Sequence, residues 1–278
     1  MNFANAEQYA LQMRREIIKM LAASGSGHPG GSLSAADILA VLFRDEMNID
    51  PADPQKADRD RFVLCKGHAA PALYAALALR GFFPVEELSG LRKLGSMLQG
   101  HPDMHKTPGV DMSTGSLGQG LSAACGMALA ARLDGLDNYT YALLGDGETE
   151  EGQVWEAAML AAHYKLDHLI AFLDHNHLQI DGCIEDVLSP EPLPEKWRAF
   201  GWRVLAADGH NSESIKQALR EDKAGSGRPV MIIAETVKGK GVCFMENQAC
   251  WHGTAPQPQE AEQALAGLYG KENSSAQA

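Results

Sequence analysis

The sequence predicts an α/β fold, in which a doubly wound parallel sheet carries helices on both faces. Short apolar runs alternate with longer stretches of helical spacing, and glycine or acidic residues follow several of the apolar runs. This alternation is typical of parallel crossover units. The chain contains no internal repeat and no long linker, so we expect one domain over residues 1–278, with a mobile polar tail from about residue 256.

The chain is predicted to begin with two helices. Residues 6–23 have apolar side chains at helical spacing, and the glycine-rich residues 24–27 stop the pattern. Arg14 and Arg15 are expected on the exposed face of this helix. Ser34 and Asp37 have the spacing of a capping box, which predicts a second helix through residue 42.

A strand and two helices are predicted next. The apolar residues 61–65 indicate a buried strand, and a helix over residues 71–79 follows, with Pro71 suited to its first turn. Residues 120–132 are rich in alanine, which predicts a helix that packs closely against another element.

The second half of the chain alternates more regularly. Residues 139–144 and 169–173 are apolar runs that predict strands, and residues 151–166 between them have helical spacing. Further strands are predicted at residues 202–206 and 229–235, with a helix at 212–222 between them. From Ala255 we expect one short helix and then the polar tail.

Composition and charge exclude several classes of function. The net charge of -12 predicts no binding to nucleic acid, because a polyanion would be repelled. No apolar run is long enough to span a membrane, and the N-terminus does not resemble a signal peptide. Five cysteines without a Cys-x-x-Cys pair indicate reduced thiols in the cytoplasm. Cys243 and Cys250 lie near His252, but a fourth ligand is missing, so zinc is not expected there.

Two polar turns follow neighbouring strands of the predicted sheet. Asp146, between two glycines, comes directly after one strand, and Asn176 follows the next strand. Because the carboxyl ends of parallel strands meet at one edge of a sheet, these residues should lie close together. Their oxygens suit Mg²⁺, and Gly145 and Gly147 would let a diphosphate approach the backbone. An ordinary crossover unit, with Asp146 as a helix cap, remains the alternative from this pattern alone.

Four histidines lie in glycine- or proline-containing loops between the predicted elements. These are His28, His68, His101 and His252. Imidazole can donate, accept or move a proton near neutral pH, and neutral imidazoles suit sugar hydroxyls. The histidines at 105, 163, 168 and 210 lack such settings, and no functional role is expected for them.

The residues from Gly145 to Gly182 closely resemble the thiamin diphosphate signature of the transketolase family. The four histidine loops and the run from Thr114 to Gly120 match this family in the expected order, so the resemblance extends from about residue 6 to residue 256. It departs from the family pattern at a few positions: Cys65, where Ser is common; Ser116, where Pro is common; and His175 and His177, at variable positions.

The resemblance implies a role for each matching residue. Asp146, Asn176 and the backbone carbonyl of Leu178 would hold Mg²⁺, or Ca²⁺ or Mn²⁺ in its place. Thiamin diphosphate would be bound by His68, Gly115, Ser116, Leu117, Asp146, Gly147, Glu151 and Asn176. His28, His101 and His252 would be catalytic, with His28 or His252 taking a hydroxyl proton and His101 binding substrate hydroxyls.

By the same resemblance the chain is the N-terminal, diphosphate-binding subunit of a split transketolase. Such an enzyme transfers a two-carbon ketol unit from a ketose phosphate to an aldose. The family's activating Glu belongs to a pyrimidine-binding domain that this sequence does not contain, and we find no Arg cluster suited to a sugar phosphate. We therefore expect a C-terminal partner subunit, an α2β2 heterotetramer and no activity from this chain alone.

Other functions remain open at this point. The chain could belong to another thiamin diphosphate enzyme, such as a 2-oxo acid dehydrogenase, although four histidine loops favour the handling of polyols. It could also be a non-catalytic or regulatory half. A nucleotide-binding Rossmann protein is disfavoured, because no Gly-x-Gly-x-x-Gly follows the first predicted strand.

Overall fold

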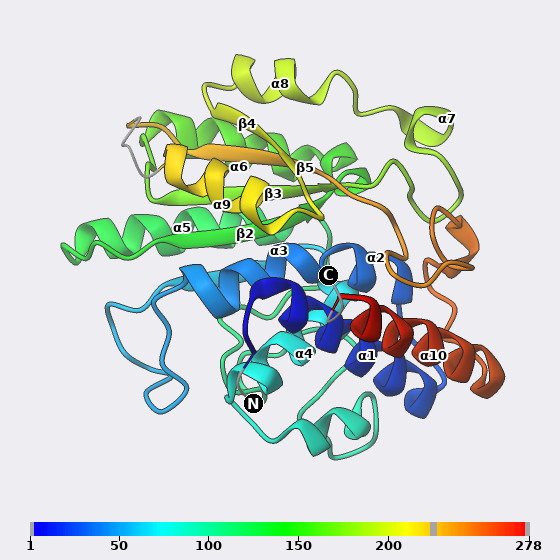
Figure 1. The fold of residues 1–278 in the computed structure, drawn as a ribbon. Coiled ribbons are helices and arrows are strands. Elements are labelled where there is room, and N and C mark those ends of the chain that lie inside the picture. The colour runs from blue at the N-terminus through cyan, green and yellow to red at the C-terminus, as the bar shows by residue number, and fades with distance from the viewer. Residues whose placement is uncertain (1–2, 223–226, 276–278) are drawn as a thin grey trace.

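The computed structural model describes residues 3–222 and 227–275, which form one parallel five-stranded sheet with helices around it (Figure 1). The strand order is β1-β2-β3-β5-β4, and every neighbouring pair is parallel. The strands are β1 (Arg61–Leu64), β2 (Thr140–Gly145), β3 (Leu169–His175), β4 (Arg203–Asp208) and β5 (Val230–Glu235). All residues of β2 and β3 are buried, which explains why these strands are continuous apolar runs rather than alternating ones.

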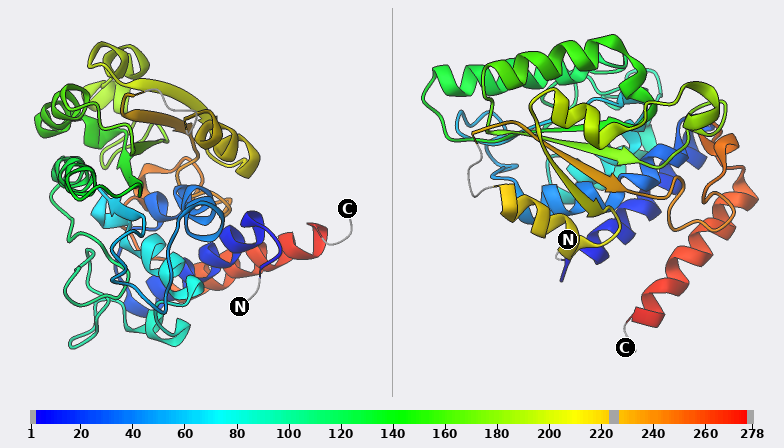
Figure 2. Two further views of the ribbon diagram at one scale, coloured as in Figure 1. Left: turned by 90° about the vertical axis from the view of Figure 1, so that its left-hand side faces the viewer. Right: turned by 90° about the horizontal axis from the view of Figure 1, so that it is seen from above.

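Helices cover both faces of the sheet, as Figure 2 shows, so the predicted doubly wound architecture is confirmed. Successive side chains of a strand point to opposite faces of the sheet, so Tyr141 of β2 packs into one hydrophobic core and Ala142 into the other. The first core includes α1 (Ala6–Ser24), α2 (Pro29–Ser34), α3 (Ala36–Ala40), α4 (Ala70–Arg80), α9 (Ser212–Asp222) and α10 (Pro258–Ser275). The second includes α5 (Gln119–Leu133), α6 (Gly152–His163) and α8 (Leu193–Ala199).

Shorter helical segments connect these elements. They are η1 (Val41–Glu46, a π-helix), η2 (Gly67–Ala69), η3 (Val85–Gly90), η4 (Gly147–Glu150), α7 (Ile184–Leu188) and η5 (Ala249–Trp251). The turn η4 stands between β2 and α6. The helix α6 begins at Gly152, within one residue of the predicted start, and ends at His163 rather than at residue 166.

The predicted capping box at Ser34 is wrong. Ser34 is the last residue of α2, and α3 begins at Ala36 without a side-chain cap. The Ser34 hydroxyl donates instead to the Asp174 carboxylate, 2.6 Å away. Asp37 binds the Arg14 guanidinium, with 3.0 Å between Nη1 and Oδ1. Both side chains therefore make long-range contacts that local spacing could not predict.

The prediction that Arg14 and Arg15 face solvent is also wrong, because both side chains are buried. Besides Asp37, Arg14 binds the backbone carbonyl of Lys240, and Arg15 binds that of Leu268. The buried guanidinium groups have protein acceptors, as such groups require.

The C-terminal region contains a longer helix than predicted. The helix α10 has 18 residues and packs along α1, where Ala261, Ala264 and Leu268 are buried. The Arg15 guanidinium lies 4.3 Å from the centre of the Tyr269 ring. The end of the predicted polar tail, residues 276–278, lies outside the described residues.

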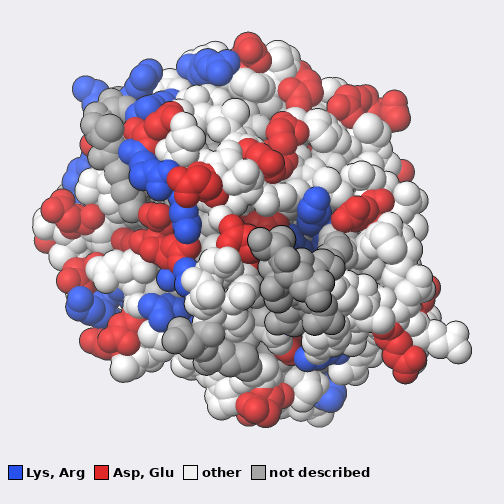
Figure 3. Space-filling model, in the orientation of Figure 1, with Lys and Arg blue, Asp and Glu red and all other residues white. Residues whose placement is uncertain are grey.

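Charged side chains of both signs are interspersed on the face drawn in Figure 3. Across the described part of the chain, no helix is both long and apolar enough to cross a membrane.

Candidate active site

The two predicted polar turns meet at the carboxyl edge of the sheet. Gly145 and Asp174 are register partners on β2 and β3, so Asp146 and Asn176 emerge side by side. The Asp146 carboxylate accepts backbone N–H groups from Gly147 at 2.8 Å, Asn176 at 2.9 Å and His177 at 2.6 Å. The predicted proximity of the two turns is therefore confirmed.

Oxygen atoms suited to a hard cation come together at these turns. Burial, and then the neighbouring Asp174 charge, raise the pKa of Asp146. A bound cation would offset both effects. The carbonyl of Leu178 accepts the Lys238 ammonium at 2.8 Å, and the Asn176 amide oxygen accepts the Leu178 N–H at 3.2 Å. A carboxylate, an amide and a carbonyl form an all-oxygen set, which fits Mg²⁺ better than a softer metal.

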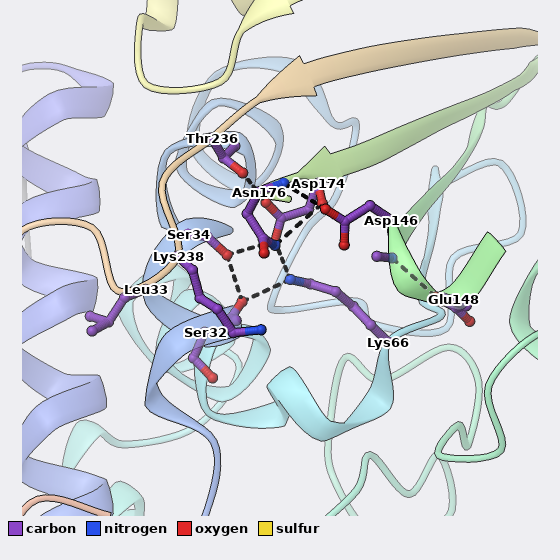
Figure 4. Close-up of polar contacts among 12 residues, drawn as sticks. Ser32, Leu33, Ser34, Lys66, Asp146, Glu148, Asp174, Asn176, Thr236 and Lys238 are labelled. Carbon is purple, nitrogen blue, oxygen red and sulfur yellow. Dashed lines mark hydrogen bonds and ion pairs between the residues drawn. The ribbon is translucent and has the colours of Figure 1, made fainter. Parts of the chain in front are cut away.

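A buried ion pair supports this edge from below (Figure 4). The Lys66 ammonium contacts the Asp174 carboxylate and donates to the Gly31 carbonyl at 2.8 Å. The hydroxyls of Ser34 and Thr236 donate to the same carboxylate. Burial alone would raise the pKa of Asp174, but the Lys66 charge and these hydrogen bonds hold it below its usual value. Asp174 therefore has a structural role: its carboxylate holds neighbouring elements together.

Three of the four predicted histidines form a cluster. The ring centres of His28, His68 and His252 lie 5.1 to 5.3 Å apart. Burial, followed by nearby positive charges, lowers the pKa of His28 to about 4 and that of His252 to about 3, and lowers that of His68 as well. The three rings are thus neutral at neutral pH and can both donate and accept hydrogen bonds. Nδ1 of His28 and of His252 is buried without a hydrogen-bond partner.

His101 lies beside this cluster rather than within it. Its ring packs against Gly115, where an added Cβ would come 2.9 Å from the imidazole. Burial and the Arg92 guanidinium lower the pKa of His101, and Arg92 also contributes to the low pKa of His28. The exposed Arg92 therefore lies near two predicted catalytic histidines. Sequence reasoning did not identify Arg92 as a residue of the site.

A cavity of about 250 Å³ joins the oxygen ligands at the two turns to the three clustered histidines. Its lining includes most of the predicted residues: His28, His68, Gly115, Leu117, Asp146, Gly147, Asn176, Leu178 and His252. His101, Ser116 and Glu151 are exposed and do not line it, although Glu151 packs against Gly118, the residue after Leu117.

The lining also contains Gly145, which was expected to let a diphosphate approach the backbone, and residues that sequence reasoning missed: Gly31, Lys66, Glu148, Gln179, Ile180 and Lys238. Glu148 accepts the N–H groups of Gly118 at 3.0 Å and Gly145 at 3.2 Å, which ties two loops together. Burial raises its pKa to about 7. Lys238 could have been found, because it closely follows β5 and the carboxyl-edge rule applies to that strand as well.

Two glycines keep the cavity lining free of side chains beside Lys66, His68 and Gln179. A Cβ at Gly31 would lie 3.4 Å from Lys66 Nζ and 3.5 Å from His68 Nε2. At Gly147 it would come 3.1 Å from the Gln179 side chain. A diphosphate needs such close approach to backbone and ammonium groups.

Comparison with known proteins identifies the family. Residues 6–275 match the family described as "Transketolase, thiamine diphosphate binding domain". The chain belongs to the transketolase family. Among its curated relatives is the 6-deoxy-6-sulfo-D-fructose transketolase subunit SqwG of Clostridium sp. (strain MSTE9), 51% identical over 88% of this chain and 91% of that protein. An apulose-4-phosphate transketolase subunit of Phocaeicola vulgatus is 42% identical over 91% of this chain and 89% of that protein.

Longer transketolases match over part of their length. Transketolase of Rattus norvegicus is 43% identical over 94% of this chain but only 41% of its own length. The crystal structure of transketolase from Campylobacter jejuni superimposes with a TM-score of 0.90 at 35% identity, over 96% of this chain and 43% of that one. The chain therefore corresponds to the thiamine diphosphate-binding part of a transketolase.

Proposed function

We propose that this chain is the cofactor-binding subunit of a two-chain transketolase that moves a two-carbon ketol unit from an anionic ketose to an aldose. The observation that carries the proposal is the cavity in which the Asp146 oxygen set faces a cluster of neutral histidines. A metal-diphosphate anchor and hydroxyl-binding groups are the two parts that such a reaction requires from this chain.

The anchor is assigned to residues that fit it chemically. Asp146, the Asn176 amide and the Leu178 carbonyl would hold Mg²⁺. Lys238, His68 and the backbone of Gly147 would contact the diphosphate, and Gly115 and Leu117 would border the cofactor's rings. When bound, thiamine diphosphate supplies the nucleophilic carbon and stores the two-carbon unit.

The histidines would act on the sugar. Because His28 and His252 are neutral and their Nδ1 atoms lack partners, each ring can receive a hydroxyl proton and return it. His101, at the border of the cofactor-ring contacts, would hold the hydroxyls of the two-carbon unit. Arg92 beside it offers a charge for the anionic end of the sugar.

The relatives' names support both the partner and the substrate class. Two of these relatives are called subunits, and their named substrates carry a sulfo group or a phosphate. We infer that a C-terminal subunit supplies the activating Glu, that two copies of each chain form the enzyme, and that the ketose ends in phosphate or sulfonate.

We place the enzyme in a reducing compartment, the cytoplasm. All five cysteines are free, and Cys65 and Cys125 are buried with pKa values raised by burial, as expected of inert thiols.

The proposed partner can be tested directly. Capture of the chain from its native lysate should recover a second protein in equal amount, carrying a pyrimidine-binding domain. The pair should transfer ketol units from ketose phosphates or sulfonates, whereas each chain alone should be inactive. Recovery of the chain alone would count against a two-chain enzyme, and turnover of 2-oxo acids but not ketoses would assign a different reaction.

Replacing His101 by alanine is expected to abolish ketol transfer in the two-chain enzyme while cofactor affinity remains within a factor of about two, because His101 lies outside the diphosphate anchor. Turnover and isothermal titration of thiamine diphosphate separate the two effects. His163→Ala, at an exposed histidine on α6, is the matched control. Unchanged turnover in the His101 variant would refute its role.

Replacing Lys238 by methionine is expected to weaken thiamine diphosphate binding at least about tenfold, because a hydrogen bond to a charged group contributes about 1.5–3 kcal/mol. Lys240→Met is the control, since Lys240 belongs to the same loop but does not line the cavity. Equal cofactor affinity in the two variants would contradict the assignment.

A further inference from the structure

A second group of metal-binding side chains lies beside the cofactor site. His175 ends β3, Glu235 ends β5, and the two residues are register partners on these neighbouring strands. Nδ1 of His175 lies 2.7 Å from Glu235 Oε1, and Nε2 of His177 lies 3.1 Å from Glu235 Oε2. Sheet pairing brings His175 to Glu235, and the turn after β3 brings His177 to the second oxygen of the same carboxylate.

These three side chains can surround one ion. One ligand atom from each lies within 4.8 Å of the others, and they form the one group of three or more such side chains found among the described residues. Ligand atoms around a zinc ion, at about 2.0 Å from the metal, are about 3.3 Å apart, so small side-chain movements would suffice. His177 and Glu235 are accessible at the surface, which allows an ion to enter.

The outer nitrogen of each imidazole also faces a carboxylate at ion-pair distance. Nε2 of His175 lies 3.0 Å from Glu191 Oε1 without an aligned hydrogen bond, and Nδ1 of His177 lies 3.6 Å from Glu185 Oε1. Histidines that bind metals commonly donate their second N–H to a carboxylate, and small rotations of these side chains would complete such bonds. This arrangement is the second feature, independent of the cluster itself, that indicates a metal site.

We propose that His175, His177 and Glu235 bind a divalent transition metal such as Zn²⁺, which is held by two histidines and one glutamate in known zinc sites. This set differs from the all-oxygen set of Asp146, Asn176 and Leu178, which suits Mg²⁺. The ion would join the ends of β3 and β5.

The metal site would also affect the turn after β3, which carries the proposed magnesium ligand Asn176. Asn176 lies between the two histidines, and the backbone N–H of His177, whose φ is +64°, donates to Asp146. An ion bound by both flanking side chains would hold this turn in the conformation that the magnesium ligands require.

The test measures metal binding by the full chain without thiamine diphosphate and in excess Mg²⁺. Titration calorimetry measures the binding of Zn²⁺, and the visible spectrum reports the binding of Co²⁺. We expect one Zn²⁺ per chain and an intense Co²⁺ spectrum of tetrahedral type. The melting temperature should rise with Zn²⁺ concentration, because the ion binds the folded state.

Variants locate the ion. His177→Asn, which tolerates a positive φ, and Glu235→Gln should each abolish the Zn²⁺ stoichiometry and the Co²⁺ spectrum. Glu191→Gln should weaken binding about 10- to 100-fold. Asp181→Asn and His163→Gln, at exposed residues outside the three ligands, should leave binding unchanged. Absence of binding in the natural chain, binding that survives in either ligand variant, or binding lost in Asp181→Asn or His163→Gln would overturn the proposal.

Discussion

Replacing Asp146 by asparagine is expected to lower ketol transfer by the assembled enzyme more than about 100-fold. Loss of residues that merely orient metal ligands costs about 10- to 100-fold, so loss of the charged ligand itself should cost more. The carboxylate is the only charged member of the proposed magnesium set, and it also fixes the turn that carries Asn176. Turnover at saturating Mg²⁺ and cofactor titration measure the effect.

Asp181→Asn is the matched control for this change, because Asp181 is an exposed acid shortly after the same turn. Its activity should stay close to that of the natural chain. If the Asp146 variant kept its activity and its need for Mg²⁺, the ion would have to be held elsewhere. The urea midpoint of each variant separates loss of the metal from loss of the fold.

Replacing Lys66 by methionine is expected to lower the free energy of unfolding by about 3–5 kcal/mol, the usual cost of leaving one member of a buried ion pair without its partner. The side chains of Lys66 and Asp174 are only 2% and 0% exposed. Without the ammonium, the pKa of Asp174 should rise, so the loss of stability should diminish as the pH falls and the carboxyl becomes protonated. Urea unfolding at several pH values measures both effects.

A lysine in an exposed ion pair serves as the control. Lys56 lies 3.1 Å from Asp58, and both side chains are about half exposed. Lys56→Met should cost less than about 1 kcal/mol. Similar losses in the two methionine variants would show that the Lys66 pair does not support the site.

The sequence could predict those parts of the fold and site that depend on residues close together in the chain. The strands β2 and β3 are continuous apolar runs because both faces are buried, and the polar residues that end them follow directly. Parallel pairing then requires Asp146 and Asn176 to meet. The histidine loops were found for the same reason, since glycine and proline beside His28 and His101 mark them locally.

The remaining features depend on contacts between distant residues. Ser34 and Asp174 are 140 positions apart, and Lys66 reaches Asp174 across 108. No local spacing reveals such pairs, and the Ser34 spacing suggested a cap that does not form. Arg14 illustrates the same limit: a charged residue in a helix usually indicates the exposed face, but here buried acceptors surround it.

The low pKa values of His28 and His252 have a consequence for the conditions under which the enzyme could work. Free histidines become protonated near pH 6.5, so a site lined with ordinary imidazoles would change its electric field during mild acidification. Here the values of about 4 and about 3 move that change well outside the physiological range. If the interior of a cell became more acidic by a full pH unit, these two histidines would therefore stay neutral. Their ability to exchange protons with a sugar would not change.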